Sequence, residues 1–348
     1  MKKHFIPRDI SWLAFNARVL QEANDPSVPL KQRLRFLGIF SNNMDEFFRV
    51  RVAALRRMIE VSGKKINFHF ESDPQSIIDQ IQFIVLQQQN EFTRIWENIL
   101  QELNQQKIFL LNETQLNKQQ QEFVQRFFEE NVRSNIIPLM IETLPSLPYL
   151  RDKSIYLGVV LQKKDSAYEQ KYSLIEVPGS YIGRFVELPA SGNEHNIILL
   201  EDIIRFNLPY IFSYFGYDTY KAHVFKVTKD AEIDIDNDIA TSFIQKIEKG
   251  LKGRRKGKAV RFVYDKEMDA GLLEYLIRKL NLSKKDNIIP GGRIHNFRNF
   301  MDFPDVFPKQ TSRKAPLVHP AFQHSLRVTD VILKQDVMLH FHITHLMQ

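Results

Sequence analysis

The residues best suited to chemistry gather in segment 41–51, which reads SNNMDEFFRVR. Asparagine amides both donate and accept hydrogen bonds, and arginine guanidinium groups pair well with phosphates. The segment is therefore compatible with a nucleotide contact by one asparagine, with Arg49 and Arg51 near the phosphates. The alternative is an ordinary helix start, in which Ser or Asn caps the helix while Asp45 and Glu46 complement its dipole.

Two later segments concentrate cationic side chains. Segment 249–258 reads KGLKGRRKGK, but it is not a Walker phosphate loop, because Lys252 stands where the first glycine is required and Ala259 replaces the hydroxyl residue. It is either a solvated connection between a helix and a strand or a patch for a polyanion. Segment 290–298 reads PGGRIHNFR, and its paired glycines allow a positive φ, which suits a turn or an anion nest.

The histidines give no convincing metal or catalytic site. The spacing of His340, His342 and His345 imitates a metal-binding pair, but no carboxylate lies close by in the sequence, so we predict no metal site. We interpret the remaining candidates as structural or exposed histidines: His295, His319 and His324. No nucleophile, base and acid occur in a recognisable order, and we assign no catalytic residue.

Residues 1–106 have the periodicity of helices. One apolar stripe begins in segment 41–51, and its members recur at helical spacing: Met44, Phe47, Phe48, Leu55, Met58 and Ile59. The opposite side of this helix is expected to carry polar residues: Asp45, Arg49, Arg56 and Glu60. A second long helix is predicted over 73–103, because Asp73-Pro74 is a favourable helix start.

The pattern changes after residue 106. A helix is predicted over 115–135, followed by strands at 155–161, 172–177, 224–227 and 260–264. Helices at 238–251 and 266–280 lie among these strands. The mixture predicts an α/β second domain. A basic linker rich in proline follows at 302–316.

Length and composition limit the class of protein. The 348 residues are 43% hydrophobic, which is enough for two domains with cores of their own. The sequence contains no cysteine, no signal-peptide pattern and no apolar run of about 20 residues, so we expect a cytoplasmic protein without a transmembrane segment. Lys and Arg exceed Asp and Glu by 48 to 41, which leaves nucleic acid, an anionic membrane surface and a phosphate polymer open as partners.

Two stretches together resemble a known family. Residues 8–23 read RDISWLAFNARVLQEA and residues 34–51 read LRFLGIFSNNMDEFFRVR. Both closely resemble the N-terminal signature of the polyphosphate kinases that work through a phosphohistidine. Family-like segments continue in the same order as TKDAE at 228–232, VRF at 260–262 and PGGRIHNF at 290–297. Because these matches are ordered and extend over nearly the whole chain, the resemblance is specific.

The resemblance implies an architecture of several domains. An all-α N domain would occupy residues 1–106 and an α/β head domain residues 107–314. Residues 315–348 would be the start of a truncated domain related to the phospholipase D fold. The activity it implies is the reversible transfer of the terminal phosphate of ATP to inorganic polyphosphate, giving ADP, with Mg²⁺ and a phosphorylated histidine. It also implies a homo-oligomer.

The resemblance carries over one site residue. The second asparagine of the family motif contacts ATP, and in this chain it is Asn43. The nucleophilic histidine, and the arginines that hold Mg²⁺ and phosphate, lie in the family's C-terminal domains. We therefore expect no catalytic residue and no metal ligand in this chain, and no activity of the chain alone.

The end of the sequence departs from the family. Residues 336–341, DVMLHF, match, but the following HITHLMQ does not, and a single-base deletion in the codons for 340–348 accounts for the change. Two alternatives remain open. The chain could be a non-catalytic module that binds polyphosphate or a nucleotide in regulation or assembly. It could also bind nucleic acid through 249–261, but that segment lacks the aromatic residues that stack on bases, so no nucleic-acid partner is predicted.

Overall fold

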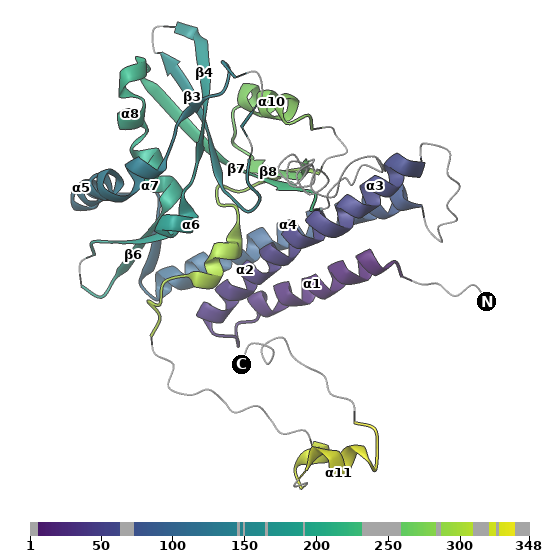
Figure 1. Ribbon diagram of the computed structural model, residues 1–348. Helices are drawn as coiled ribbons and strands as arrows, with labels where there is room; N and C mark the ends of the chain where they lie inside the picture. Colours follow the sequence, from purple (N-terminus) through teal and green to yellow (C-terminus); the bar gives the residue numbers. More distant parts are fainter. Residues whose placement is uncertain are drawn as a thin grey trace, which may run out of the picture. The chain divides into compact units, whose positions relative to one another are not determined.

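The computed structural model describes residues 6–62, 73–144, 147–148, 150–163, 166–190, 192–231, 259–282, 287–308, 320–324 and 327–337. The chain divides into two compact units, Met1–Pro304 and Asp305–Gln348. In the first unit, a set of helices is followed along the sequence by a mixed α/β region, as the sequence predicts (Figure 1). The predicted helix at 238–251 and the cationic segment 249–258 lie outside the described residues.

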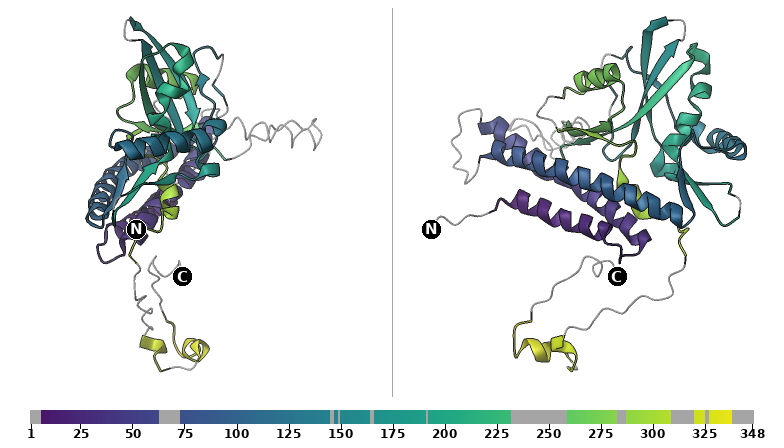
Figure 2. Two further views of the ribbon diagram at one scale, coloured as in Figure 1. Left: turned by 90° about the vertical axis from the view of Figure 1, so that its left-hand side faces the viewer. Right: turned by 180° about the vertical axis from the view of Figure 1, so that it is seen from behind.

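The N-terminal part is a set of packed helices. Its elements are α1 (Arg8–Asn24), α2 (Leu30–Glu46), a π-helical segment η1 (Phe47–Val52), α3 (Ala53–Ser62) and α4 (Pro74–Gln105). Helices α1, α2 and α4 lie side by side, and each contacts the other two (Figure 2). Helix α4 begins as predicted, since the Asp73 carboxylate accepts a hydrogen bond from the Ser76 backbone N–H at 3.0 Å.

The expectation that a helix starts within segment 41–51 is wrong. Residues 41–46 form the last turns of α2, which begins twelve residues before Asn42 at Leu30, directly after Pro29. The apolar stripe is continuous from Leu30 through Phe40 to Phe48, so the helix needs no cap at residue 41. Asp45, which the pattern places on the side opposite the apolar stripe, is nevertheless buried.

Two sheets follow the helices. The larger has the order β2-β4-β3-β7-β8-β9, and its pairs are antiparallel except for the parallel pair β8–β9. Its strands are β2 (Leu139–Met140), β3 (Tyr156–Lys163), β4 (Ser166–Glu176), β7 (Thr219–Lys229), β8 (Ala259–Asp265) and β9 (Ile288–Gly291). The smaller sheet has the order β1-β6-β5, formed by Ile108–Leu111, His195–Leu199 and Phe185–Leu188. The strands expected at 155–161 and 172–177 overlap β3 and β4 with one residue outside each, and those expected at 224–227 and 260–264 fall within β7 and β8.

Helices cover both faces of the larger sheet (Figure 1). Alternate residues of β3 point to opposite faces, so Leu157 and Val159 join the core on one side while Tyr156 and Val160 join the core on the other. The first face packs against α5 (Lys118–Phe127), α7 (Leu200–Phe206) and α8 (Leu208–Ile211), and the second against α10 (Ala270–Lys279). Shorter helical elements are α6 (Gly179–Ile182), η2 (Phe128–Val132), η3 (Arg133–Asn135) and η4 (Ser213–Phe215).

A segment that follows β9 returns to the helices. The 3-10 helix η5 (Phe297–Asp302) packs on α2, and its two buried rings, Phe297 and Phe300, contact Trp96 of α4 at centroid distances of 4.9 and 5.1 Å. The approach to α2 is close at Gly38, where a Cβ atom would lie 2.7 Å from Met301 Cγ and 3.1 Å from the Phe297 carbonyl oxygen. Glycine at position 38 therefore permits this packing.

The described residues of the second unit form η6 (Pro320–Phe322) and α11 (Val328–Ile332). Within the ranges that the structure describes, no helix combines the length and the apolar character needed to cross a lipid bilayer.

Candidate functional site

The last turns of α2 direct consecutive polar side chains to different partners. Asn43 faces α1, Asp45 reaches strands β7 and β8, and Glu46 pairs with Lys153 in the loop before β3, at 2.7 Å. The hydrogen bond from Lys153 is the main reason that the pKa of Glu46 lies below its ordinary value. Residues adjacent in the sequence are therefore separated in space by the 100° step of the helix.

Asn43 is half-buried. Its side-chain Nδ2 donates to Asn16 Oδ1 at 3.1 Å, and Asn16 is fully buried in α1. One turn further along, Phe47 stacks on Trp12 of α1, with ring centroids 4.6 Å apart. These contacts fix the Asn43 side chain at the α1–α2 interface while part of its surface remains exposed. Among the described residues, no recorded hydrogen bond uses Asn43 Oδ1, so this oxygen can accept one from a ligand.

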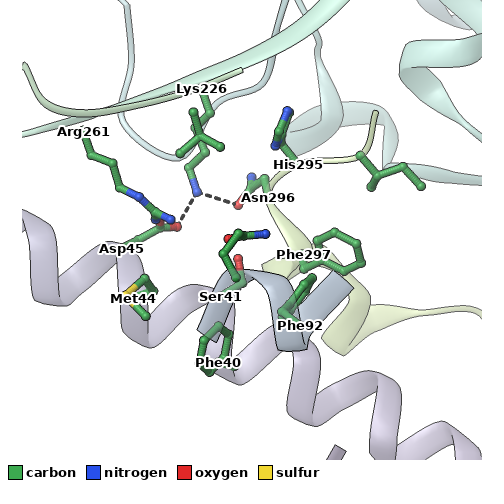
Figure 3. A pocket seen from close by; sticks show the side chains of 13 residues that line it. Phe40, Ser41, Met44, Asp45, Phe92, Lys226, Arg261, His295, Asn296 and Phe297 are labelled. Atoms are coloured by element: carbon green, nitrogen blue, oxygen red, sulfur yellow. Dashed lines mark hydrogen bonds and ion pairs between the residues drawn. The ribbon is translucent and has the colours of Figure 1, made fainter. Parts of the chain in front are cut away.

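Asp45 holds two cations from the sheet. Its carboxylate forms an ion pair with Lys226 Nζ of β7 and another with Arg261 Nη1 of β8, the latter at 3.3 Å (Figure 3). The Arg261 guanidinium also lies over the Phe48 ring, 4.8 Å from its centroid. All four residues are buried, so this cluster joins the helices to the end of the sheet through charged groups that water does not screen.

Burial dominates the electrostatics of the two cations. Burial lowers the pKa of Lys226, and the Asp45 carboxylate opposes that shift. Burial likewise lowers the pKa of Arg261, again with Asp45 opposing it. One carboxylate thus balances two buried basic groups, which leaves an excess of positive charge at this point.

Segment 290–298 reaches the same cluster, but not through a glycine turn. Gly291 lies in β9 and neither Gly291 nor Gly292 has a positive φ, so the backbone conformation that the paired glycines allow is not used there. The left-handed residue is Asn296, with a φ of 55°. Its Oδ1 accepts from Lys226 Nζ at 3.2 Å, and its Nδ2 donates to the Lys153 carbonyl oxygen at 2.9 Å.

Arg184 clamps the backbone of this segment. It precedes β5 and donates from Nη2 to the His295 carbonyl oxygen at 2.6 Å and from Nη1 to the Asn296 carbonyl oxygen at 2.7 Å. Glu201 of α7 neutralises Arg184, at 2.6 Å. Both side chains of this pair are 1% exposed, so the pair is fully enclosed and supports the segment rigidly.

A cavity of about 50 Å³ lies beside the cluster (Figure 3). Its lining comes from α2, α4, β7, β8 and segment 294–297: Phe40, Ser41, Met44, Asp45, Gln89, Phe92, Lys226, Arg261, Val263, Ile294, His295, Asn296 and Phe297. Two buried nitrogens on lining residues, Arg261 Nε and His295 Nε2, have no hydrogen-bond partner among the residues that the structure describes. Burial lowers the pKa of His295 to about 3, so this imidazole is neutral at pH 7.

The other candidates from the sequence lie elsewhere. Arg49 is paired with Glu46 at 3.6 Å, and both Arg49 and Arg51 are half-buried. His295 is a buried structural histidine and His324 is exposed, which agrees with the interpretation from the sequence. His319, His340, His342 and His345 lie outside the described residues.

Lys226, Arg261 and Arg184 are the residues that motif analysis missed. No short motif surrounds Lys226, but it interrupts the apolar run VFKV in a buried strand, and Arg261 interrupts AVRFV in the same way. A charged residue inside a buried strand requires a partner. That signal was present in the sequence, although it does not reveal that the partner is Asp45.

The described residues do not provide a metal centre. Within 6–62, 73–144 and the other described ranges, no group of three His, Asp or Glu side chains is placed to hold a metal ion. Magnesium prefers several oxygen ligands at close range, so the residues present do not fit a Mg²⁺ site.

Comparisons with known proteins give a consistent result. Residues 5–111 match the family model of the polyphosphate kinase N-terminal domain, and residues 119–303 match that of the polyphosphate kinase middle domain. The chain is 37% identical to a polyphosphate kinase of Vibrio vulnificus strain YJ016 over 99% of this chain and 50% of the relative. It is 38% identical to the polyphosphate kinase of Escherichia coli strain K12, over 98% of this chain and 50% of the relative.

A solved structure is also similar. The crystal structure of polyphosphate kinase from Porphyromonas gingivalis matches with a TM-score of 0.74 and 27% identity, over 95% of this chain and 46% of that chain. The chain spans about half the length of the curated relatives it matches.

Proposed function

Because this chain belongs to the polyphosphate kinase family, we propose that it supplies the helical and α/β parts of an enzyme that transfers phosphate from ATP to polyphosphate. The observation that carries this proposal is the match of both family models, in order, to the helices and to the mixed α/β region. Positioning and neutralisation of charge are the protein's main tasks in phosphoryl transfer, and a scaffold with buried cations is suited to them.

Within this function, Asn43 is the residue proposed to contact ATP. Its position supports the assignment, since the side chain is half-exposed, is held by Asn16 and retains a carbonyl oxygen that can accept a hydrogen bond from a nucleotide. Neighbouring Asn42 is half-buried as well and provides a matched control.

Nucleotide binding by the purified 348-residue chain tests the assignment. We expect a fluorescent ATP analogue to bind weakly, and Asn43→Ala to weaken binding several-fold because one hydrogen bond contributes about 0.5–1.5 kcal/mol. Asn42→Ala should bind like the parent chain. Equal affinity in all three proteins would remove Asn43 from the nucleotide site.

We further propose that the chain alone does not elongate polyphosphate. The family's phosphorylated histidine and its Mg²⁺-holding groups belong to C-terminal domains, and the half-length match to the relatives supports their absence from these 348 residues. Incubation of the purified chain with ATP and polyphosphate should give no elongation, and sustained elongation would contradict the proposal.

The finer organisation belongs to the same proposal. Residues 315–348 would open a phospholipase D-like domain, supported by the family-like DVMLHF at 336–341. The working enzyme would be a homo-oligomer. It would act in the cytoplasm, and the absence of cysteine from the sequence supports this location.

A further inference from the structure

The cavity beside Asp45 has walls of two kinds. Lys226 and Arg261 of the sheet form a buried cationic side, whereas Phe92 and Phe297 form an apolar side (Figure 3). Three lining residues, Ser41, Gln89 and Ile294, are partly exposed and give the cavity a route to solvent. A polar ligand that enters past the Ser41 hydroxyl and the Gln89 amide would thus meet hydrogen-bonding groups first and fixed charge beyond them.

The charges that line the cavity do not cancel. Lys226 and Arg261 are cations, Asp45 is the single carboxylate among the lining residues, and His295 is neutral at pH 7 because burial lowers its pKa to about 3. The nearby Arg184–Glu201 pair is balanced within itself. An excess buried positive charge is costly unless an anion compensates it.

Unused hydrogen-bonding capacity lies on the same residues. Arg261 Nε and His295 Nε2 are buried and have no hydrogen-bond partner within the described part of the chain. The Lys226 ammonium has three donors, and among the described residues it uses two, toward Asp45 and Asn296. Buried polar groups almost always have partners, so three open positions on residues that line one cavity favour a ligand with acceptor atoms.

Size restricts what that ligand can be. A buried water needs about 10–15 Å³, so a cavity of about 50 Å³ admits a group several times larger than one water molecule. A single tetrahedral phosphate group is of this order, whereas a whole nucleotide is far larger. We infer that this cavity binds a single phosphate group, either free orthophosphate or the end of a polyphosphate chain.

This site is separate from the proposed nucleotide contact. Asn43 is not among the lining residues, because it points to α1 from the opposite side of the α2 end. The inference therefore does not depend on the ATP assignment.

Calorimetric titration of the 348-residue chain with inorganic phosphate tests the inference, with sodium chloride of equal ionic strength as the control. We expect saturable binding of one phosphate per chain. Lys226→Met should weaken binding about ten-fold or more, because it removes a charged donor. Gln89→Leu removes a donor at the partly exposed entrance and should weaken binding several-fold without unfolding the protein.

Gln87→Leu is the matched control, since Gln87 lies on the same helix, is exposed and does not line the cavity. Circular dichroism identifies any variant that fails to fold, and if Lys226→Met fails, Gln89→Leu decides. No saturable binding by the parent chain, or parental affinity in Gln89→Leu, would overturn the inference and leave a cavity filled by water.

Tripolyphosphate distinguishes the two sources of the phosphate group. Competition with orthophosphate would support insertion of a chain end, and binding of orthophosphate without competition would support a site for the free ion. Both results require the cavity to accept one phosphate group.

Discussion

The two sides of the α2 end differ in how they hold a polar side chain. On the sheet side, Asp45 is buried and paired with Lys226 and Arg261. On the α1 side, two residues earlier, Asn43 is half-exposed, and among the described residues its side chain makes one hydrogen bond, to Asn16. The buried ion pairs of Asp45 thus lie next to the accessible amide of Asn43. These ion pairs fix the end of α2, and α2 in turn positions the Asn43 side chain.

Removal of the Asp45 carboxylate should have the largest effect on this arrangement. Asp45→Ala leaves two buried cations without their carboxylate, which is expected to lower the free energy of unfolding by about 3–5 kcal/mol. Urea denaturation measures the loss. A decrease in the free energy of unfolding of less than about 1 kcal/mol would show that water reaches the Asp45 cluster. Asp45 and Asn43 would then contribute to stability to a similar extent.

Acid should weaken the sheet side next. The pKa of His295 falls from its ordinary 6.5 to about 3 in the folded chain, chiefly through burial. Below pH 6.5 the unfolded chain takes up a proton that folded His295 does not, so stability present above that pH is lost as the pH falls toward 3. Between pH 6.5 and about pH 5 the expected loss is about 2 kcal/mol.

A histidine variant isolates this contribution. His295→Gln should flatten the acid limb of a plot of unfolding free energy against pH, whereas the same change at exposed His324 should not. Identical acid limbs in the parent and in His295→Gln would show that His295 does not set the acid sensitivity.

A substitution at Gly38 tests the packing of η5 on α2, the helix that carries both Asp45 and Asn43. In Gly38→Ala the new methyl group would meet Met301 and the Phe297 carbonyl oxygen at 2.7 and 3.1 Å, so η5 must shift from α2. Overpacking of this kind costs about 1–3 kcal/mol, and the better helix propensity of Ala returns up to about 1 kcal/mol. Thermal unfolding should therefore show a net loss, and an unchanged melting temperature would contradict the close approach.

The smallest change in stability is expected on the open side. Asn43→Ala removes the hydrogen bond to Asn16, which should lower the free energy of unfolding by about 1 kcal/mol or less. The same urea experiment that detects the Asp45 effect measures it. A loss as large as that of Asp45→Ala would contradict the difference between the two sides.

Sequence patterns were sufficient where the structure depends on local chemistry. The Asp73-Pro74 start of α4 and the apolar runs of β3 and β7 were predicted because capping, proline geometry and burial act within a few residues. The start of α2 was misplaced because Ser41 and Asn42 have capping chemistry, although Pro29 marks the true beginning. Ser and Asn have the same local sequence signal whether they lie inside a helix or cap its N-terminal end.

The site depends on contacts that no local pattern contains. Asp45 and Lys226 are 181 residues apart, and Arg184 reaches His295 across 111 residues. Lys226 and Arg261 each interrupt an apolar strand, and this pattern indicates a buried cation. Only the fold identifies Asp45 as their partner. The resemblance to the family located Asn43 as a candidate, and whether it contacts ATP stays a prediction.

The return of η5 to the helices has a consequence for synthesis on the ribosome. Helices α1, α2 and α4 are made first, yet Phe297 and Phe300, which complete their aromatic core at Trp96, are made almost two hundred residues later. The helical set therefore cannot complete its aromatic core until the sheet and η5 have been translated.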